Sequence, residues 1–477
     1  MIEVRTDRSS LSRYCFTLLL ACACAAIAIP QDAAPISTPA SFEAPQAADD
    51  TLTPMLLSLN DVVEMALDTN LDIRLADLAF QEATAAIGEA KAADRVLLDF
   101  AASYSRLGPV SSIEMPGTTP PVTITTGTDR NWMYGVDLYK SIYSSGRNRA
   151  LVTLAMLNVD ATELAAAVTR RQILLAATTM FYGVTRAASF VDVAADTVAN
   201  AREHWQLAAA RYEAGAVPRF DVMRAEVEVA NAEQQLIIAE TAVETAKSVL
   251  KTLLHIDVTR PIELTAEPLP ATITVEPQIS IETAYRNRQE LEVGRKQIQL
   301  ALTNKRLARA GRGLNLDLVG GYDRQSSGGL GGGDYAWNLT LSATKSITDG
   351  GASRSKEAQA LQQAEQARTL LTKLYDDIAQ EVWQAYLDLQ QADSRLTSTA
   401  KTVELAEEAL RIAEVRYEAG IATPVEITDA RLALTGARTN HVDAIYGYRL
   451  AQAQLASAVN VSTDTLATLA DKGRQQH

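Results

Sequence analysis

The sequence contains the same long pattern twice, at a constant offset. The pentapeptide RYEAG occurs at Arg211–Gly215 and returns at Arg416–Gly420, and in both copies an acidic residue followed by Val or Ile comes after five further positions. At the same offset LYKSIYSSGRNR, Leu138–Arg149, lies over ATKSITDGGASR, Ala343–Arg354. Self-similarity that continues from one landmark to the next without a gap indicates a duplicated structural unit.

The beginnings of the two units also match. LSLNDVVEMALDTN, Leu57–Asn70, resembles ISIETAYRNRQEL, Ile279–Leu291. Within each repeat, the predicted order is helix, strand, loop, strand, very long helix, turn, helix. We therefore divide the chain into a first repeat at 57–258, a connector at 259–278, a second repeat at 279–462 and a C-terminal tail at 463–477.

The longest predicted helices lie in the second half of each repeat. Ala352 to Ala419 contains no Pro or Gly, and Asn148 to Ala214 contains only Gly183. At 1.5 Å per residue the former would extend roughly 100 Å, which requires coiled-coil support. Apolar residues make up 47% of the chain and aromatic residues only 5%, a composition that suits close helix packing. The expected seam positions step by three and four residues: Val198, Ala201, Trp205, Ala208 and Tyr212, and Val403, Ala406, Leu410, Ala413 and Tyr417.

Each repeat also contains a pair of segments with a period of two. WNLTLSATK, Trp337–Lys345, places apolar and polar side chains on opposite faces, and LNLDL, Leu314–Leu318, does the same. FAASYSRL, Phe100–Leu107, and YGVDLYKSI, Tyr134–Ile142, alternate less regularly. The predicted strands are about 97–107, 131–143, 314–324 and 335–346, with Gly-, Ser- and Thr-rich loops between the members of each pair.

These strands have the length and alternation of an outer-membrane β-barrel. Four strands cannot close a barrel alone, and two hairpins of a soluble sheet are the alternative. An interfacial belt of aromatic residues favours the membrane; its candidates are Trp132, Tyr139, Tyr335 and Trp337.

The N-terminus has the features of an export signal at 1–28, followed by a disordered Ala/Pro/Ser/Thr linker at 29–55. Arginines precede the apolar segment CFTLLLACACAAIAI, and cleavage after Ala28 is one interpretation. The other is lipidation of Cys22, because LLAC, Leu19–Cys22, resembles a lipobox. The three cysteines all fall within this early region, so the rest of the chain is free of thiols.

Composition and motifs argue against several functions. A net charge of −14 gives no basic face for a phosphate backbone, so we expect no nucleic-acid partner. We also expect no enzyme, cofactor or metal site, because the four histidines (His204, His255, His441 and His477) form no ligand-spaced motif. GGLGGGD, Gly328–Asp334, lacks the lysine and the following helix of a phosphate-binding loop.

The chain resembles outer-membrane efflux proteins of the TolC type from about Leu57 to Ser462. The resemblance rests on the duplicated plan, the joints KSIYSSGR and KSITDGG, and the duplicated RYEAG turn. This resemblance implies a mainly α fold with a β-barrel portion. Three identical subunits would form a twelve-stranded barrel in outer-membrane lipid and a helical cylinder through the periplasm. The trimer would be the exit duct of a tripartite efflux or type I secretion system, with a periplasmic adaptor (membrane fusion protein) and an inner-membrane transporter.

Under this resemblance, the two RYEAG copies are helix-hairpin tips that meet the adaptor, and Arg211, Gly215, Arg416 and Gly420 match the tip motif. Helix capping is the alternative role, since glycine adopts positive φ and a proline follows each turn. The resemblance further assigns Glu426, Asp429 and Asp221 to the periplasmic entrance and Tyr417 to its latch. Acids in the first turn of a helix also stabilise the helix dipole. Ala422 stands where the family's latch arginine is expected.

Two rival functions remain at this stage, a periplasmic adaptor and a structural coiled-coil protein of the envelope. An adaptor would place a single hairpin inside a lipoyl-like β-domain, whereas this chain has two hairpins and two strand pairs. A structural coiled coil has no use for strands at a fixed place in each repeat. The sequence does not specify the substrate.

Overall fold

The computed structural model describes residues 54–462 and residue 465, apart from 107, 109–111, 116–121, 126–129, 266, 268–272, 274, 326–334 and 420. The described elements belong to one compact unit, Met55–His477. The predicted signal peptide, Cys22, nearly all of the linker and nearly all of the C-terminal tail lie outside the described residues.

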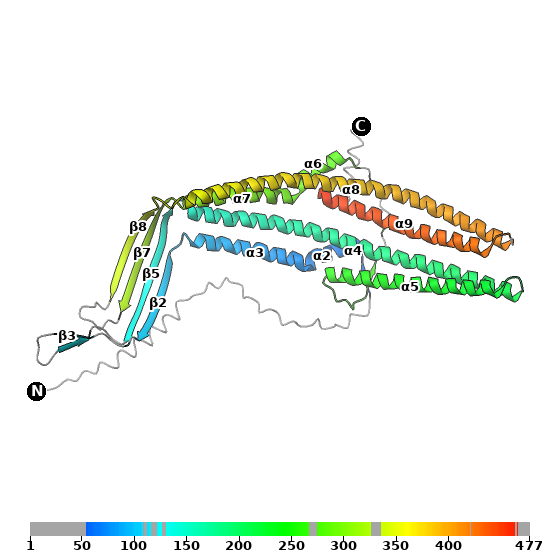
Figure 1. Cartoon of the computed structure of the whole chain (residues 1–477), viewed down its shortest axis with the longest axis horizontal. Helices are drawn as coiled ribbons and strands as arrows, with labels where there is room; N and C mark the ends of the chain where they lie inside the picture. Colours follow the sequence, from blue (N-terminus) through cyan, green and yellow to red (C-terminus); the bar gives the residue numbers. More distant parts are fainter. Residues whose placement is uncertain are drawn as a thin grey trace, which may run out of the picture. The chain divides into compact units, whose positions relative to one another are not determined.

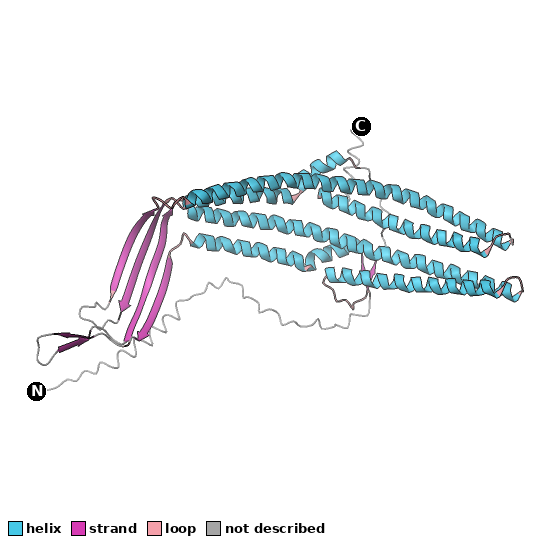
Figure 2. Ribbon diagram, in the orientation of Figure 1, coloured by secondary structure: helices cyan, strands magenta, loops and turns pink. Residues whose placement is uncertain are grey.

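Both repeats have the same element order, in which a strand pair comes between two pairs of helices in sequence, and the strands extend from one end of the helices (Figures 1 and 2). The first repeat comprises α2 (Leu59–Thr69), α3 (Leu71–Ala92), β2 (Leu97–Arg106), β5 (Arg130–Ser144), α4 (Arg147–Glu213) and α5 (Arg219–Leu253). The second comprises α6 (Pro277–Asn287), α7 (Gln289–Ala310), β7 (Leu314–Gln325), β8 (Ala336–Lys345), α8 (Ala352–Glu418) and α9 (Pro424–Val459). Short strands add two small sheets, β1 (Met55–Leu57) parallel to β6 (Ile262–Leu264), and β3 (Ser112–Met115) antiparallel to β4 (Val122–Thr125).

The two long helices are confirmed, and each has 67 residues. Each begins after a glycine with positive φ, Gly146 at 85° and Gly351 at 88°. That conformation favours glycine because it lacks a Cβ, which explains the glycine in each strand-to-helix joint. Within the described part of the chain, α4 is the one helix long and apolar enough, by length and composition, to cross a membrane. Its sides contact α3, α5, α7 and α9.

The single helix expected before each strand pair is two helices, broken at Asn70 and at Arg288. Both residues have extended backbones, with ψ of 131° and 116°. Asn70 Nδ2 donates to Leu253 O at 3.1 Å, and Arg288 Nε donates to Ala458 O at 2.8 Å. Each break therefore connects the start of a repeat to the last turn of that repeat's final helix. Contacts so distant in sequence leave no periodic signal, so the sequence did not reveal the break.

The predicted seam of α4 is correct only in part. Val198, Ala201 and Ala208 are buried, but Trp205 is 37% exposed and Tyr212 is 45% exposed. His204, 6% exposed, occupies the buried position between the alanines. The helix therefore turns His204, and not Trp205, toward its neighbours together with Val198, Ala201 and Ala208.

The four main strands form one antiparallel sheet in the order β2-β5-β7-β8, so the pairs of the two repeats meet at β5 and β7. The register separates two chemically different faces. One face is apolar: Leu98, Phe100, Tyr104, Trp132, Val136, Leu138, Leu318, Tyr322, Trp337, Leu339 and Leu341. The other carries Asp99, Asp137, Asp317 and Asp323 among Ser, Thr, Asn and Gly. Because β2 and β8 are the outer strands, neither sheet edge has a partner strand among the residues that the structure describes.

Two apolar clusters hold the helices together where the halves of each repeat meet. Phe181 of α4 has 0% exposure and packs in a cluster with Val62, Leu250 and Leu254. In the second repeat Tyr448 is the largest residue of the equivalent cluster, and its hydroxyl accepts from the Ile273 backbone N–H at 3.0 Å.

We expect Phe181→Ala to lower the free energy of unfolding by about 3–5 kcal/mol, because it opens a cavity in a fully enclosed cluster. Phe220→Ala is the matched control, since Phe220 is 69% exposed and its loss should cost less than about 0.5 kcal/mol. Urea unfolding of the purified protein, followed by far-ultraviolet circular dichroism, measures both. Equal midpoints would show that the cluster does not carry the stability assigned to it.

Candidate functional site: the helix-hairpin tips

The first RYEAG copy forms a helix-ending turn. Ala214 is the C-cap residue after α4, and Gly215 follows with φ of +77°. The Gly215 N–H donates to Tyr212 O at 2.9 Å, and the Ala216 N–H donates to Arg211 O at 2.8 Å. These two bonds define a Schellman motif, which requires a left-handed residue where Gly215 stands. The predicted capping role of Gly215 is confirmed.

The second copy makes the same kind of turn. The Ile421 and Ala422 N–H groups both donate to Arg416 O, at 2.9 and 3.1 Å. Thr423 then caps α9, which starts at Pro424. Gly420 lies outside the described residues. The duplicated pentapeptide thus serves the same purpose twice: it ends a very long helix and turns the chain into the returning helix (Figure 1).

The three predicted entrance acids have different environments. Glu426 completes a capping box, with its Oε1 accepting from the Thr423 N–H at 3.2 Å, and its Oε2 lies 3.3 Å from Arg416 Nη1. Its carboxylate is therefore used within the turn, as the capping alternative predicts. Asp429 is exposed, one helical turn further along α9. Asp221 is half-buried in the first turn of α5.

The predicted latch residue lies between the two hairpins. Tyr417 is 6% exposed, and the Arg211 guanidinium carbon lies 4.3 Å from the centre of its ring. The His204 ring meets the same tyrosine edge-on, with centroids 6.4 Å apart. A cation over an aromatic face contributes about 0.5–2 kcal/mol, depending on desolvation.

The two RYEAG copies therefore touch one another, Arg211 of the first against Tyr417 of the second. This contact supplies an arginine beside Tyr417 although Ala422 replaces the one that the family resemblance predicts. The sequence offered both residues as candidates but assigned them separate roles, because nothing in a linear pattern shows that the copies face each other.

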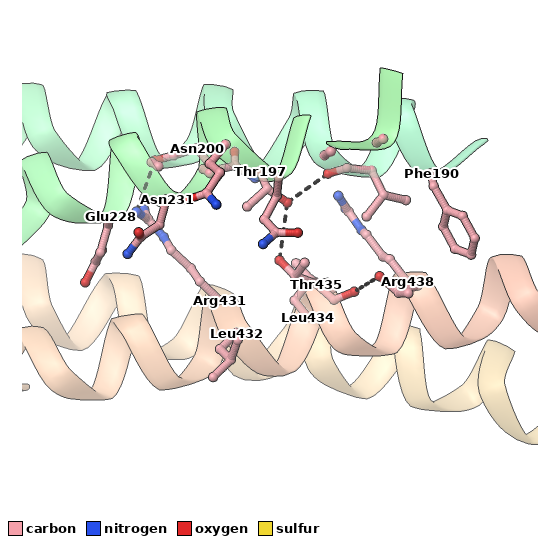
Figure 3. A pocket seen from close by; sticks show the side chains of 18 of the residues that line it. Phe190, Thr197, Asn200, Glu228, Asn231, Arg431, Leu432, Leu434, Thr435 and Arg438 are labelled. Carbon is pink, nitrogen blue, oxygen red and sulfur yellow. Dashed lines mark hydrogen bonds between the residues drawn. The ribbon is translucent and has the colours of Figure 1, made fainter. Parts of the chain in front are cut away.

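Behind the tips, polar side chains join the hairpins around a cavity of about 630 Å³, lined by α4, α5, α8 and α9 (Figure 3). Thr197 and Thr435 bring their hydroxyls within 3.4 Å of each other across it. Arg431 donates to Asn200 O at 3.1 Å and pairs with Glu414 at 3.2 Å. These contacts connect the first hairpin to the second at several successive turns.

At the sheet, the predicted aromatic belt is only partly as expected. Trp132 and Trp337 lie on the apolar face, and the Trp132 ring stacks on Tyr134 with centroids 5.4 Å apart. Tyr139 lies on the opposite, polar face, where its hydroxyl donates to Asp317 Oδ1 at 3.1 Å. Strand alternation puts Tyr139 and Trp132 on opposite faces, because the two residues are an odd number of positions apart. Tyr335 is 65% exposed just before β8.

Among the residues that the structure describes, there is no group of three or more His, Cys, Asp or Glu side chains that could hold a metal ion.

The structure thus combines two capped helical hairpins with an amphipathic sheet assembled from both repeats. The outer membrane efflux protein family model matches residues 62–254 and 280–461, and the chain belongs to this family. It is a protein of the bacterial outer membrane, with a large helical periplasmic part.

Individual proteins resemble this chain over most of its length. Protein CyaE of Bordetella pertussis is 24% identical over 345 residues, which cover 71% of this chain and 72% of CyaE. The outer membrane protein VceC from Vibrio cholerae has the same fold with a TM-score of 0.70 at 19% identity, covering 85% of this chain and 96% of VceC. The CmeC outer membrane channel of Campylobacter jejuni has a TM-score of 0.71 at 18% identity, covering 85% of this chain and 88% of CmeC.

Proposed function

We propose that three copies of this chain form a channel through the outer membrane. The observation that carries this proposal is the main sheet, which is apolar on one face and polar on the other. Its outer strands β2 and β8 have no further strand partner in the described part of the chain. In lipid every backbone group must be hydrogen-bonded, so such a sheet has to close with strands from other copies. Three copies would close a twelve-stranded barrel, with the apolar face toward lipid and the carboxylates toward the pore.

Cross-linking and light scattering of the detergent-purified protein test this assembly. We expect a cross-linked series that ends at three subunits and a species whose electrophoretic mobility changes on heating. A stable monomer in detergent would contradict the proposal.

We further propose that the channel is the exit duct of a tripartite efflux or type I secretion system, with the hairpin tips docking a periplasmic adaptor that links it to an inner-membrane transporter. Arg211 and Arg416 already have partners within the chain, Tyr417 and Glu426. The exposed apolar residues at the tips, Phe220 at 69% and Ile421 at 70%, therefore offer the better docking contacts. The sequence analysis missed them because it followed the repeated motif, and these two residues fall outside it.

A photo-cross-linker at Phe220 or Ile421 tests the docking in cells that contain the adaptor. An adaptor-sized adduct from these positions, and none from a helical position far from the tips such as Leu405, is expected. Adducts of equal strength at all three positions would argue against tip docking.

The family assignment and the strand pair in each repeat disfavour the rival interpretations as an adaptor or a structural coiled coil.

Asp429, the exposed acid of the second tip, is a better candidate than Glu426 for cation binding at the entrance. Threefold symmetry would bring three copies of Asp429 around one axis, and closely spaced carboxylates bind polyvalent cations. The Glu426 carboxylate, by contrast, forms an ion pair with Arg416 and accepts a hydrogen bond from the Thr423 N–H at the start of α9.

We therefore expect Asp429→Asn to weaken the affinity of a blocking trivalent cation by about tenfold, because each subunit loses one negative charge. Single-channel recordings measure this block. Glu426→Gln should affect block less and helix stability more. The double variant should resemble Asp429→Asn alone. Unchanged block in both single variants would remove these residues from the entrance.

A further inference from the structure

Four short joints connect the helices of this protein to the strands of its main sheet. They are 93–96 between α3 and β2, 145–146 between β5 and α4, 311–313 between α7 and β7, and 346–351 between β8 and α8. Figure 1 shows them at the end of the helices where the strands begin.

Contacts tie each joint to the next one across the sheet. Asn148 Nδ2 donates to Asp94 Oδ1 at 2.7 Å and connects the first two joints. Ser145 Oγ donates to Leu314 O at 2.7 Å and connects the second joint to the start of β7. Arg312 pairs with Glu357 at 2.7 Å and connects the last two. The joints therefore form one continuous level of the molecule.

Exposed basic side chains gather at this level. Six of them lie in a joint or within three residues of one: Arg95, Arg147, Arg149, Arg309, Lys345 and Arg354. We call these six residues the basic collar. The joints themselves contain two carboxylates, Asp94 and Asp349, and both accept hydrogen bonds inside the molecule. The collar is thus a positive level in a chain whose net charge is −14.

Helix stability does not account for the collar residues at the start of the two long helices. The first turn of a helix favours acidic side chains, because the helix dipole places partial positive charge there. Neither long helix has an acidic residue in its first turn. Arg147 and Arg149 stand at the start of α4, and Arg354 stands at the equivalent position of α8. A ligand of negative charge would offset this unfavourable arrangement.

The KSI motif at both strand-to-helix joints adds an exposed apolar side chain beside a lysine. Lys345 continues the apolar face of β8, since it follows Leu341 by an even number of residues. Ile347, two positions further, is 99% exposed. In the first copy Ile142 follows Lys140 in the same way and is 54% exposed. Exposed apolar side chains next to cations suit the boundary between lipid headgroups and acyl chains.

We propose that the basic collar binds the phosphate groups of anionic phospholipids in the periplasmic leaflet of the outer membrane. The proposal rests on the proposed channel function, which turns the apolar face of the sheet toward lipid and places the helices in the periplasm. The joints then lie at the level of the periplasmic headgroups. Guanidinium groups bind phosphate with two parallel hydrogen bonds, and the KSI isoleucines reach the acyl chains beside them.

A lipid fits this surface better than a protein partner does. The collar adjoins the apolar face directly and draws residues from all four joints, so it follows the sheet along its whole width. A lipid layer surrounds a barrel on every side and meets such a level everywhere. Binding at this level would fix the depth at which the sheet sits in the membrane.

Native mass spectrometry of the detergent-purified trimer, titrated with phosphatidylglycerol, tests the collar. Phosphatidylcholine with the same acyl chains is the uncharged comparison. We expect the wild type to bind phosphatidylglycerol more tightly, and added salt should weaken that preference by screening. Arg149→Gln combined with Arg354→Gln should weaken phosphatidylglycerol binding by about thirtyfold and leave phosphatidylcholine binding unchanged.

The matched control removes two basic side chains elsewhere. Lys401 and Arg411 are exposed on α8, far along the helix from the joint, so Lys401→Gln with Arg411→Gln should keep wild-type affinity for both lipids. Ile347→Asn removes an apolar contact without changing charge, and it should weaken the binding of both lipids by similar factors. Inorganic phosphate should not displace the lipid, because it has no acyl chains for the isoleucines.

Each outcome separates the collar from the channel. If the wild type forms no trimers, the channel proposal fails and the collar with it. If trimers form but bind the two lipids equally, or if the collar variant matches the control, only the collar is overturned. Displacement by inorganic phosphate would overturn the assignment to lipid. Should the double variant fail to assemble, Lys345→Gln removes one collar charge, and unchanged phosphatidylglycerol affinity in that variant overturns the collar as well.

Discussion

Replacing Leu339 with arginine is expected to stop the protein from accumulating as an outer-membrane trimer. Leu339 lies near the middle of β8 on the apolar face and is 64% exposed within the single chain. If that face meets lipid, an arginine there costs about 2–4 kcal/mol per subunit near the bilayer midplane. The cost recurs in each of three subunits, so assembly should fail rather than weaken. Immunoblots of outer-membrane fractions, with and without heating, measure it.

The neighbouring residue provides the control. Thr340 is on the polar face of the same strand, paired with Val319, so Thr340→Arg would place its charge toward the pore. We expect normal amounts of trimer from Thr340→Arg. If both variants assemble, the apolar face does not meet lipid, and if only Leu339→Arg assembles, the sheet faces the other way.

The elements with a strong local period could be predicted from the sequence. The long helices follow from the lack of Pro and Gly between Ala352 and Ala419, and the glycine of the first tip follows from the need for positive φ. The amphipathic strand β8 was the clearest strand in sequence because its alternation is uninterrupted. These features depend on neighbours in sequence, which a linear pattern records.

The contacts that build the candidate site depend on residues far apart in sequence. The sequence placed Arg211 and Tyr417 near the tips but could not show that one stacks on the other. The sequence identified His204 only as a histidine outside any metal motif. Its position in α4 between Ala201 and Ala208, two predicted seam residues, was a signal that it is buried. The sequence grouped Tyr139 with Trp132 by residue type, whereas the strand register places the two side chains on opposite faces.

A disulfide between the two hairpins is expected to lock the channel shut. Thr197 of α4 and Thr435 of α9 hold their hydroxyl oxygens 3.4 Å apart, so sulfur atoms in the same positions need only a small rotamer adjustment to reach the bonding distance of about 2.05 Å. The only native cysteines are Cys15, Cys22 and Cys24, so a Thr197→Cys, Thr435→Cys protein contains no competing thiol after that region.

If opening requires the hairpins to separate, the oxidised double variant should assemble normally but export substrate only at background level. Reduction should restore wild-type export, and each single cysteine variant should export normally in either redox state. Gel mobility without reductant verifies that the bond has formed. Full export by the oxidised protein would show that the hairpins stay together at Thr197 and Thr435 during opening. Any movement that opens the entrance would then have to occur nearer the tips, between the cavity and the two RYEAG turns.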